Sequence, residues 1–303
     1  DAVPMMPRFV IRHLKAQMTS KFEGLDNEFI LLGETFTNEG GHDHIRYYLG
    51  QHGLDGQFDF PFMWALRNVF AHKTASAQDL IDAWRTSERA WLGSKSTMAL
   101  MIGNHDVPRF TSVAAHQDVF NPWGRPPSQV TASNVLERPL MAQAVVLALP
   151  GIATIYYGDE LGLSGGHDPD NRRPYPDLST VATNQQMLQS QVQRLGKARQ
   201  CLMKGLTQDV ELNSPSPSHI TLIRHHVTTQ TPRLLVVIDR DKTHQSTVLS
   251  NRKNGLMPNQ NWLDILSGEQ FSTSATTMTI APSATGTRWL LSTSDPCANL
   301  GVR

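Results

Sequence analysis

Three apolar runs in the first half of the chain each stop at a glycine that is followed by polar or acidic residues. They cover residues 29–32, 98–102 and 152–157 and are almost wholly hydrophobic. Short unbroken apolar runs are typical of strands that are buried on both faces, as in a parallel sheet. The pattern therefore predicts three strands of one parallel sheet.

Segments with the apolar spacing of helices separate these predicted strands. One begins after Ser76, which we expect to be an N-cap because Asp79 follows three residues later. Its apolar face includes Trp84 and Trp91. Further helices are predicted over residues 8–18, 63–72, 136–149 and 184–203, a short strand over 58–60 and a loop over 37–57. Alternating strands and helices predict an α/β fold with a parallel sheet.

The pattern changes near residue 205, where helical spacing gives way to short β-like runs separated by turns. These six runs cover residues 220–223, 234–238, 247–249, 262–265, 278–280 and 289–291. Short strands at this spacing predict a small antiparallel β-sandwich. We therefore divide the chain into an α/β domain, residues 1–204, and an all-β domain, residues 205–303.

Composition narrows the classes of function. The chain has 303 residues, of which 39% are hydrophobic and 18% charged, so it can bury a full core. Its 27 Lys and Arg residues balance 27 Asp and Glu residues, and we expect no nucleic-acid partner. No apolar run approaches the roughly 18 residues that a membrane span needs, so no membrane partner is expected either.

The two cysteines, Cys201 and Cys297, lie far apart in the sequence. One pair in a chain of this length neither requires nor excludes a single disulfide, and it leaves the redox compartment open. We expect Cys201, on the last long helix, to be simply a buried thiol.

Side chains capable of chemistry gather where the apolar runs end. Glu34 follows the first run, Asn104, His105 and Asp106 follow the second, and Asp159 follows the third. In (β/α)₈ barrels the active site is built by loops at the carboxyl ends of several strands. We therefore expect these side chains to meet on one face of the sheet.

With these segments identified, the chain resembles the α-amylase family of glycoside hydrolases over nearly its whole length. Gly-Glu at 33–34 is similar to the family segment that bears the proton donor, and Asn-His-Asp at 104–106 to the segment that bears the third essential carboxylate. Residues 150–160 and 168–174 resemble the last barrel strand and its loop. Asp-Ala-Val at 1–3 resembles the end of the segment that bears the nucleophile.

The resemblance implies a retaining hydrolase that acts on α-glucosidic bonds of starch-like glucans or maltooligosaccharides. Asp1 would attack the anomeric carbon, and Glu34 would act first as general acid and then as general base. Asp106 would stay ionised and bind sugar hydroxyls most strongly in the transition state.

The resemblance also assigns four substrate-binding residues. Asn104 and His105 would bind the sugar beside the catalytic acids, and Asp168 with Arg172 would hold the next glucose unit. For Asp168 and Arg172, an ordinary surface ion pair is the alternative.

The family pattern further implies that the fold is a partial (β/α)₈ TIM barrel, with strands from about the fourth to the eighth, followed by the small antiparallel β-sandwich. Unpaired strand edges and an uncovered interior would then favour aggregation or a partner. We expect this chain to be the carboxyl-terminal portion of a longer enzyme with little activity alone, and the amino-terminal half of the barrel to be a candidate partner. Calcium is a candidate cofactor of the longer enzyme only, and no metal ligand is assigned in this chain. A secreted or periplasmic location is favoured over a cytoplasmic one.

Two alternative functions stay open. A transglycosylase or isomerase of the same family would share every catalytic carboxylate and differ only in how water is kept from the intermediate. A non-catalytic glucan-binding or interaction fragment would suit a chain that lacks barrel strands.

Three weaker motifs have ordinary explanations. Glu39 with His42 and His44 could suggest a metal site, but such spacing is more typical of a solvated loop. The loop at 168–171 is weakly similar to a calcium loop, although the arginines that follow spoil the acidic ring. Trp123, in a proline-rich loop, is the best candidate for stacking on a sugar, and most other tryptophans should be core.

Overall fold

Four short parallel strands follow one another in chain order. The structure, a computed structural model, describes residues 2–22, 29–118, 120–121 and 123–298. Strand β1 (Leu32–Gly33) pairs with β2 (Gly56–Gln57), and β3 (Ala99–Leu100) pairs with β4 (Ile152–Ala153). A parallel bridge between Phe58 and Ala99 joins the two pairs. The prediction of parallel strands alternating with helices is confirmed.

These strands are shorter than the sequence pattern predicted. Past the paired residues, one carbonyl in each of the second and third apolar runs accepts from an arginine side chain instead of a neighbouring strand. The carbonyl of Ile102 accepts from Arg67, and that of Tyr157 accepts from Arg109. Apolar character therefore marked buried segments correctly but overestimated how far each stays in the ladder.

The predicted strand at 58–60 is wrong at its second half. Phe60 instead begins helix α3 (Phe60–Leu66), because the Asp59 carboxylate accepts from the Phe62 backbone N–H at 3.0 Å and caps the helix. Helix α3 continues directly into η2 (Arg67–His72), a π-helical segment. Together α3 and η2 cover the predicted helix at 63–72 and begin three residues earlier.

The other helices largely match the predictions. They are α1 (Arg8–Phe22), α4 (Ala77–Trp91), α6 (Ser133–Ala148) and α7 (Thr183–Leu202). Two short helices were not predicted: α2 (His42–Tyr48), which lies in the predicted loop at 37–57, and α5 (Phe110–Ala114). Each has too few residues for a helical period to be recognised.

Short 3₁₀ turns and one further helical turn connect the longer elements. They are η1 (Val3–Met5), η3 (Asp159–Leu161), η4 (Asp170–Arg172), η5 (Leu178–Thr180), η6 (Met203–Gly205) and α8 (Asn251–Asn254). None of the described helices combines the length and the hydropathy that a membrane span requires.

The carboxyl-terminal part forms the predicted antiparallel sheets. A six-stranded sheet has the order β10-β9-β12-β7-β6-β5, and β8 (Thr247–Ser250) pairs separately with β11 (Thr277–Ile280). The six strands are β5 (Glu211–Ser216), β6 (His219–His225), β7 (Pro232–Asp239), β9 (Asn261–Asp264), β10 (Gln270–Ser272) and β12 (Thr287–Ser292). The two strands that we did not predict, β5 and β10, are the edges of this sheet and are mostly polar.

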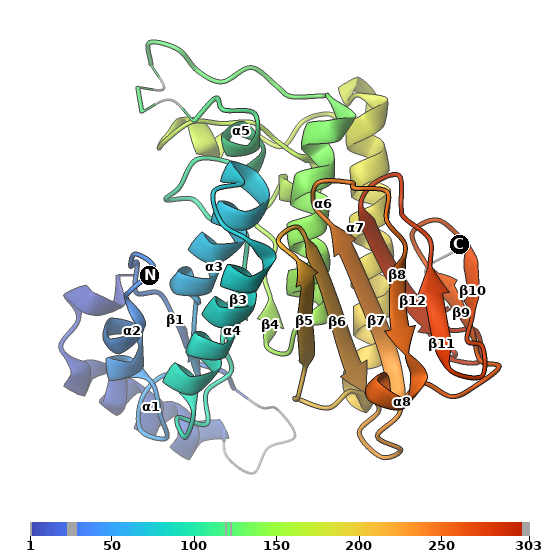
Figure 1. Ribbon diagram of the computed structural model, residues 1–303. Coiled ribbons are helices and arrows are strands. Elements are labelled where there is room, and N and C mark those ends of the chain that lie inside the picture. The colour runs from blue at the N-terminus through green and yellow to red at the C-terminus, as the bar shows by residue number, and fades with distance from the viewer. Residues whose placement is uncertain (1, 23–28, 119, 122, 299–303) are drawn as a thin grey trace.

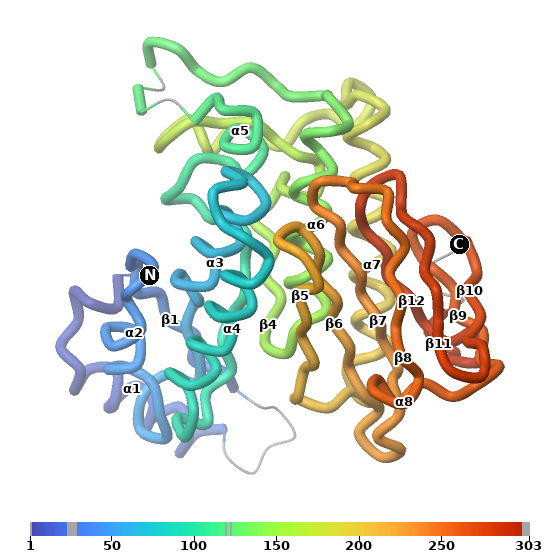
Figure 2. Tube along the Cα trace, viewed as in Figure 1, coloured from blue at the N-terminus to red at the C-terminus, as the bar shows by residue number. Residues whose placement is uncertain are grey.

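The six-stranded sheet has an apolar core on each face. Leu234 and Val236 of β7 point into the core shared with α6 and α7, whereas Leu235 and Val237 point toward β8 and β11. Figure 1 shows α6 and α7 behind this sheet, and Figure 2 shows α1 and α2 on the opposite side of the molecule from β9 to β11. The sequence division at residue 204 stays a prediction.

Buried arginines hold the carboxyl end of α6. Arg199 of α7 donates to the carbonyls of Leu147, Leu149 and Gly151, and Arg224 of β6 donates to Ala148. These carbonyls have no partner inside the helix, and cations are favourable at a helix C-terminus. Burial lowers the pKa of both arginines to about 10. The α7 helix and the antiparallel sheet therefore both fasten the turn that leads into β4.

The two cysteines form a disulfide, so the expectation of a simple buried thiol at Cys201 is wrong. Cys201 of α7 is bonded to Cys297, 96 positions along the chain. Arg233 contacts the Cys297 sulfur and pairs with Asp295 beside it. The bond closes a loop that contains all the antiparallel strands.

The capping box of α4 gives a first stability prediction. The Asp79 backbone N–H donates to Ser76 Oγ at 3.2 Å, and the Ser76 N–H donates to the Asp79 carboxylate at 2.7 Å. We expect Ser76→Ala to lower the free energy of unfolding by about 1 kcal/mol, measured by urea denaturation. Ser20→Ala, on the exposed side of α1, is the control and should cause no loss. Equal effects of the two substitutions would contradict the cap.

The disulfide gives a second stability prediction. We expect the Cys201→Ser, Cys297→Ser double variant to lose about 2–5 kcal/mol of unfolding free energy, because cross-linking a long loop restricts the unfolded chain. A reducing agent should lower the melting temperature of the unsubstituted chain and leave that of the double variant unchanged. If a reducing agent left the melting temperature of the unsubstituted chain unchanged, the presence of the disulfide would be refuted.

Candidate active site

Glu34 and Asn104 meet at the carboxyl ends of β1 and β3. Asn104 Nδ2 donates to Glu34 Oε1 at 2.9 Å, and both side chains are buried, with exposed fractions of 8% and 6%. The Asn104 side chain also accepts from the Asp106 backbone N–H at 3.0 Å. One amide thus fixes the carboxylate of Glu34 and the turn that carries Asp106.

His105 and Asp106 complete the cluster. His105 Nε2 lies 3.4 Å from Asp106 Oδ1, and both side chains are about one-third exposed. Ligand atoms of Glu34, His105 and Asp106 all lie within 4.8 Å of one another. Side chains from segments 70 residues apart therefore converge on one point, as predicted. Asp159, which we also expected there, is instead buried beside Arg109.

The predicted substrate-binding pair adjoins this cluster. Arg172 Nε lies 2.7 Å from Asp168 Oδ1, and Arg172 Nη2 lies 3.7 Å from Asp106 Oδ1. The guanidinium is half-exposed and reaches both carboxylates. Asp168 and Arg172 therefore form more than an isolated surface pair, because Arg172 also faces the central acid.

Asp1 lies outside the described residues. The chain directly after it is described, and the Val3 backbone N–H donates to the Glu34 carbonyl at 3.1 Å. Val3 therefore runs beside the residue whose side chain lies in the cluster. The proposed role of Asp1 stays a prediction.

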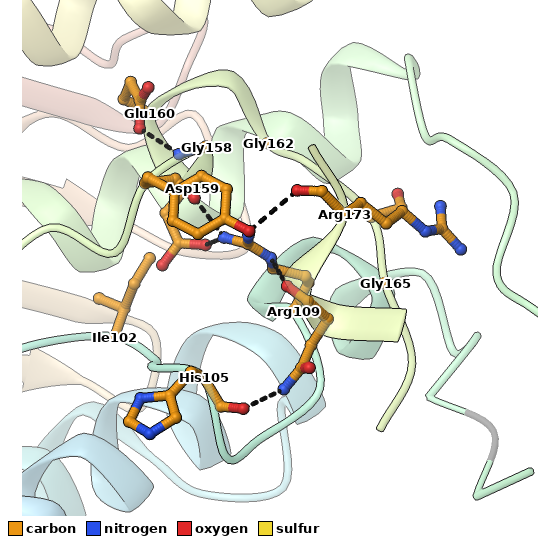
Figure 3. A network of polar contacts seen from close by, with 12 residues as sticks. Ile102, His105, Arg109, Gly158, Asp159, Glu160, Gly162, Gly165 and Arg173 are labelled. Carbon is orange, nitrogen blue, oxygen red and sulfur yellow. Dashed lines mark hydrogen bonds and ion pairs between the residues drawn. The ribbon is translucent and has the colours of Figure 1, made fainter. Parts of the chain in front are cut away.

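A buried network holds the polar loop at residues 103–107. Arg109 donates to the carbonyl of Asn171 at 2.7 Å, and Asn171 Nδ2 donates to the carbonyls of His105 and Val107 at 2.8 and 2.9 Å. Figure 3 shows Arg109 beside Asp159 and the hydrogen bond to the His105 carbonyl. The loop is thus fixed through its backbone, which leaves its side chains free to face the cluster.

Asp159 supplies the charge that balances Arg109. Its carboxylate lies 3.2 Å from Arg109 Nη1, and both side chains are buried. Burial raises the pKa of Asp159 to about 6, although the neighbouring Arg109 opposes that rise. Tyr156 and Tyr157 flank the guanidinium, whose central carbon lies 4.1 and 4.7 Å from their ring centres. Arg109 is therefore held by a carboxylate on one side and by two aromatic rings.

Sequence reasoning missed the supporting residues Arg67, Arg109 and Asn171. Arg67 and Arg109 are almost fully buried, at 1% and 2% exposed. Arg67 directly follows the apolar stretch 60–66, and Arg109 stands between Pro108 and Phe110. An arginine inside an apolar segment was the available signal, because such a residue is rarely buried unless it is paired.

Exposed aromatic rings lie on two loops. Phe36, two residues after Glu34, is half-exposed and packs edge-on against Phe60 with ring centres 5.0 Å apart. Trp123 is 81% exposed, which is compatible with sugar stacking. Its predicted role stays untested.

The weaker metal motifs are occupied by other contacts. His42 and His44 lie in helix α2 rather than in the predicted loop, and residues two apart on a helix do not face each other. In the loop at 168–171, Asp168 pairs with Arg172, and Asp170 accepts from Arg173. Among the described residues, the set of three or more possible metal ligands is the cluster of Glu34, His105 and Asp106 itself.

Comparisons with known proteins identify relatives of this chain. A family model described as "Alpha amylase, catalytic domain" matches residues 5–262. The chain is 27% identical over 181 residues to a cyclomaltodextrin glucanotransferase from Bacillus sp. (strain 1-1), which covers 60% of this chain and 23% of that relative. An Anoxybacillus alpha-amylase aligns with a TM-score of 0.75 and 22% identity over 97% of this chain and 58% of that structure. An alpha-amylase from Geobacillus thermoleovorans, complexed with acarbose, aligns with a TM-score of 0.74 and 21% identity over 97% and 59%.

The chain spans less than two thirds of the length of each of these proteins. At these identities the solved structures show a shared fold, and the family model covers most of the chain. Parallel strands with a polar cluster at their carboxyl ends, followed by an antiparallel sheet, are therefore the catalytic-domain fold of that family. The chain belongs to the alpha-amylase family.

Proposed function

We propose that this chain carries the acid-bearing part of an active site that cleaves α-glucosidic bonds in starch-like glucans or maltooligosaccharides with retention of configuration. The observation that supports this proposal is the meeting of Glu34, His105 and Asp106 within 4.8 Å. Glu34 is the general acid and base, and Asp1 is the nucleophile. Retaining enzymes place those two carboxyls about 5–5.5 Å apart across the sugar.

Glu34 suits proton transfer because it is buried and receives one hydrogen bond from Asn104. It donates its proton to the departing glycosidic oxygen and later removes a proton from the incoming water. Asn104 orients the carboxyl group, so its role here is to position Glu34 as well as to contact the sugar.

Asp106 and His105 bind hydroxyls of the sugar whose bond is broken. Both are partly exposed and side by side, so their polar atoms are accessible to a ligand. Positive charge develops on the sugar ring as the bond breaks, and the fixed carboxylate of Asp106 stabilises it. Asp168 and Arg172 bind the next glucose unit, and Arg172 links that unit to Asp106.

Transglycosylation is the second candidate. The same carboxylates would form the glycosyl-enzyme, and a sugar hydroxyl instead of water would accept it. This candidate is supported by the similarity of the chain to a protein named cyclomaltodextrin glucanotransferase. Analysis of products in the presence of an added sugar acceptor separates the two reactions.

Further barrel strands outside this chain complete the site in this proposal. Two observations support that view. Side chains at the two ends of the parallel array, Leu32 and Ile155, are 37% and 41% exposed although apolar, and the chain covers 58% of the Anoxybacillus enzyme. If the chain is inactive even when further barrel strands are supplied, a non-catalytic role in glucan binding would be the better explanation.

An oxidising compartment suits the protein best. Disulfides persist in secreted and periplasmic proteins and are rare in the cytosol, and Cys201 is bonded to Cys297. We therefore favour a secreted or periplasmic location.

Turnover tests the proposal directly. We expect residues 1–303 alone to hydrolyse maltoheptaose far more slowly than a full-length alpha-amylase, because in this proposal further strands are needed to position the nucleophile. Glu34→Gln and Asp106→Asn should abolish the remaining turnover, measured by chromatography of the released sugars. Rates equal to those of the full-length enzyme would refute the need for further strands, and unchanged rates in both variants would refute the site.

Binding tests the substrate pair separately from catalysis. We expect Arg172→Ala to weaken maltoheptaose binding about tenfold, since hydrogen bonds to a charged group contribute about 1.5–3 kcal/mol. Calorimetric titration of the purified chain measures it. Arg85→Ala removes a comparable exposed arginine, paired with Asp82 on α4, and should leave the affinity unchanged. The assignment fails if both variants bind like the unsubstituted chain.

A further inference from the structure

Arg67 lies directly beneath the loop that carries the polar cluster. It comes from the π-helical segment η2, and its side chain is 1% exposed. Nη1 donates to the Ile102 carbonyl at 3.1 Å, and Nη2 donates to the Pro108 carbonyl at 2.8 Å. These two carbonyls stand at the two ends of the 103–107 loop, so one guanidinium spans its base.

The fit beneath the loop is close. A Cβ atom added to Gly103 would lie 3.3 Å from Arg67 Nη1 and 3.8 Å from Asp159 Oδ2. The rings of Trp64 and Phe110 lie 5.8 and 5.9 Å from the central guanidinium carbon. The absence of a side chain at Gly103 and the two flanking rings thus define the place of the planar group.

We propose that Arg67 is a positioning residue that sets the separation of the two ends of the 103–107 loop and thereby aims Asn104, His105 and Asp106 at Glu34. This inference rests on the proposed function. A guanidinium has several donors in a rigid plane, so it can fix two carbonyls at once where an ammonium fixes one. Arg109 and Asn171 hold the middle of the loop from the other side.

The segment that carries Arg67 is itself held from two directions. Arg138 of α6 donates to the Ala71 carbonyl at 3.2 Å, and Arg240, just after β7, donates to the Ala75 carbonyl at 2.6 Å. Lys73 pairs with Asp241 at 3.0 Å. The position of Arg67 therefore depends on contacts with α6 and with the antiparallel sheet.

Arg199 provides a matched comparison. It is also buried and also donates to main-chain carbonyls, and burial lowers the pKa of both Arg67 and Arg199 to about 10. Its carbonyls, however, precede β4 and do not touch the 103–107 loop. A general stabilising role predicts similar local effects for the two arginines, whereas positioning predicts an effect on this loop from Arg67 alone.

Hydrogen exchange followed by mass spectrometry tests the inference on the intact chain. Arg67→Met keeps the length of the side chain and removes both hydrogen bonds, and Arg67→Lys keeps the charge and can reach one carbonyl. We expect the peptide with residues 103–107 to exchange at least about tenfold faster in Arg67→Met and at an intermediate rate in Arg67→Lys. Arg199→Met should speed exchange around residues 147–151 and leave the loop unchanged.

Maltoheptaose titration and the His105 ring signals in NMR give the functional readouts. We expect the affinity to fall about tenfold in Arg67→Met, with a shift of the His105 ring signals, and neither change in Arg199→Met. Loop exchange equal to that of the unsubstituted chain, or equally raised in Arg199→Met, would overturn the role of Arg67. If the unsubstituted chain fails to bind maltoheptaose, the proposed function is wrong, while the exchange result still decides whether Arg67 holds the loop.

Discussion

Contacts between buried guanidinium groups and main-chain carbonyls hold the segments around the candidate site. Arg67 and Arg109 donate to carbonyls at the ends of the apolar runs, and Arg199 and Arg224 donate to carbonyls at the end of α6. A buried carbonyl without a partner is costly, and so is a buried charge without one. Pairing the two satisfies both at once. The chain can therefore leave the sheet at these points while its carbonyls stay hydrogen-bonded.

This arrangement separates the support of the site from its chemistry. The groups that hold the 103–107 loop bind its backbone, whereas its side chains are left to face Glu34 and a ligand. The Asn104 side chain is the exception, because it also accepts from the Asp106 backbone N–H within the loop. A site built in this way can hold Glu34 and Asp106 close together although two ionised carboxylates repel each other.

Local sequence patterns predicted the elements better than their ends. The capping pair of Ser76 and Asp79 was recognised because both partners lie within four residues, and the cluster at Glu34 was recognised because family motifs mark it. The strand at 58–60 was misassigned, because Asp59 caps a helix that alternation of apolar residues could not reveal. Arg67 escaped notice for a different reason: its partners are 35 and 41 positions away. Contacts at that distance leave no periodic trace in a single sequence.

Helix α6 lies between the two halves of the molecule. Leu140 and Val145 belong to the same apolar core as Ile102 on one side and Trp289 of β12 on the other, and the Trp289 indole N–H donates to the Ala144 carbonyl at 3.3 Å. Removing the antiparallel sheet would therefore expose one apolar side of α6. The other side of α6 packs in the same core as Ile102, which directly precedes the 103–107 loop. Because both halves pack on α6, we expect them to unfold together. For the same reason, replacing the antiparallel sheet with that of a relative should destabilise the protein.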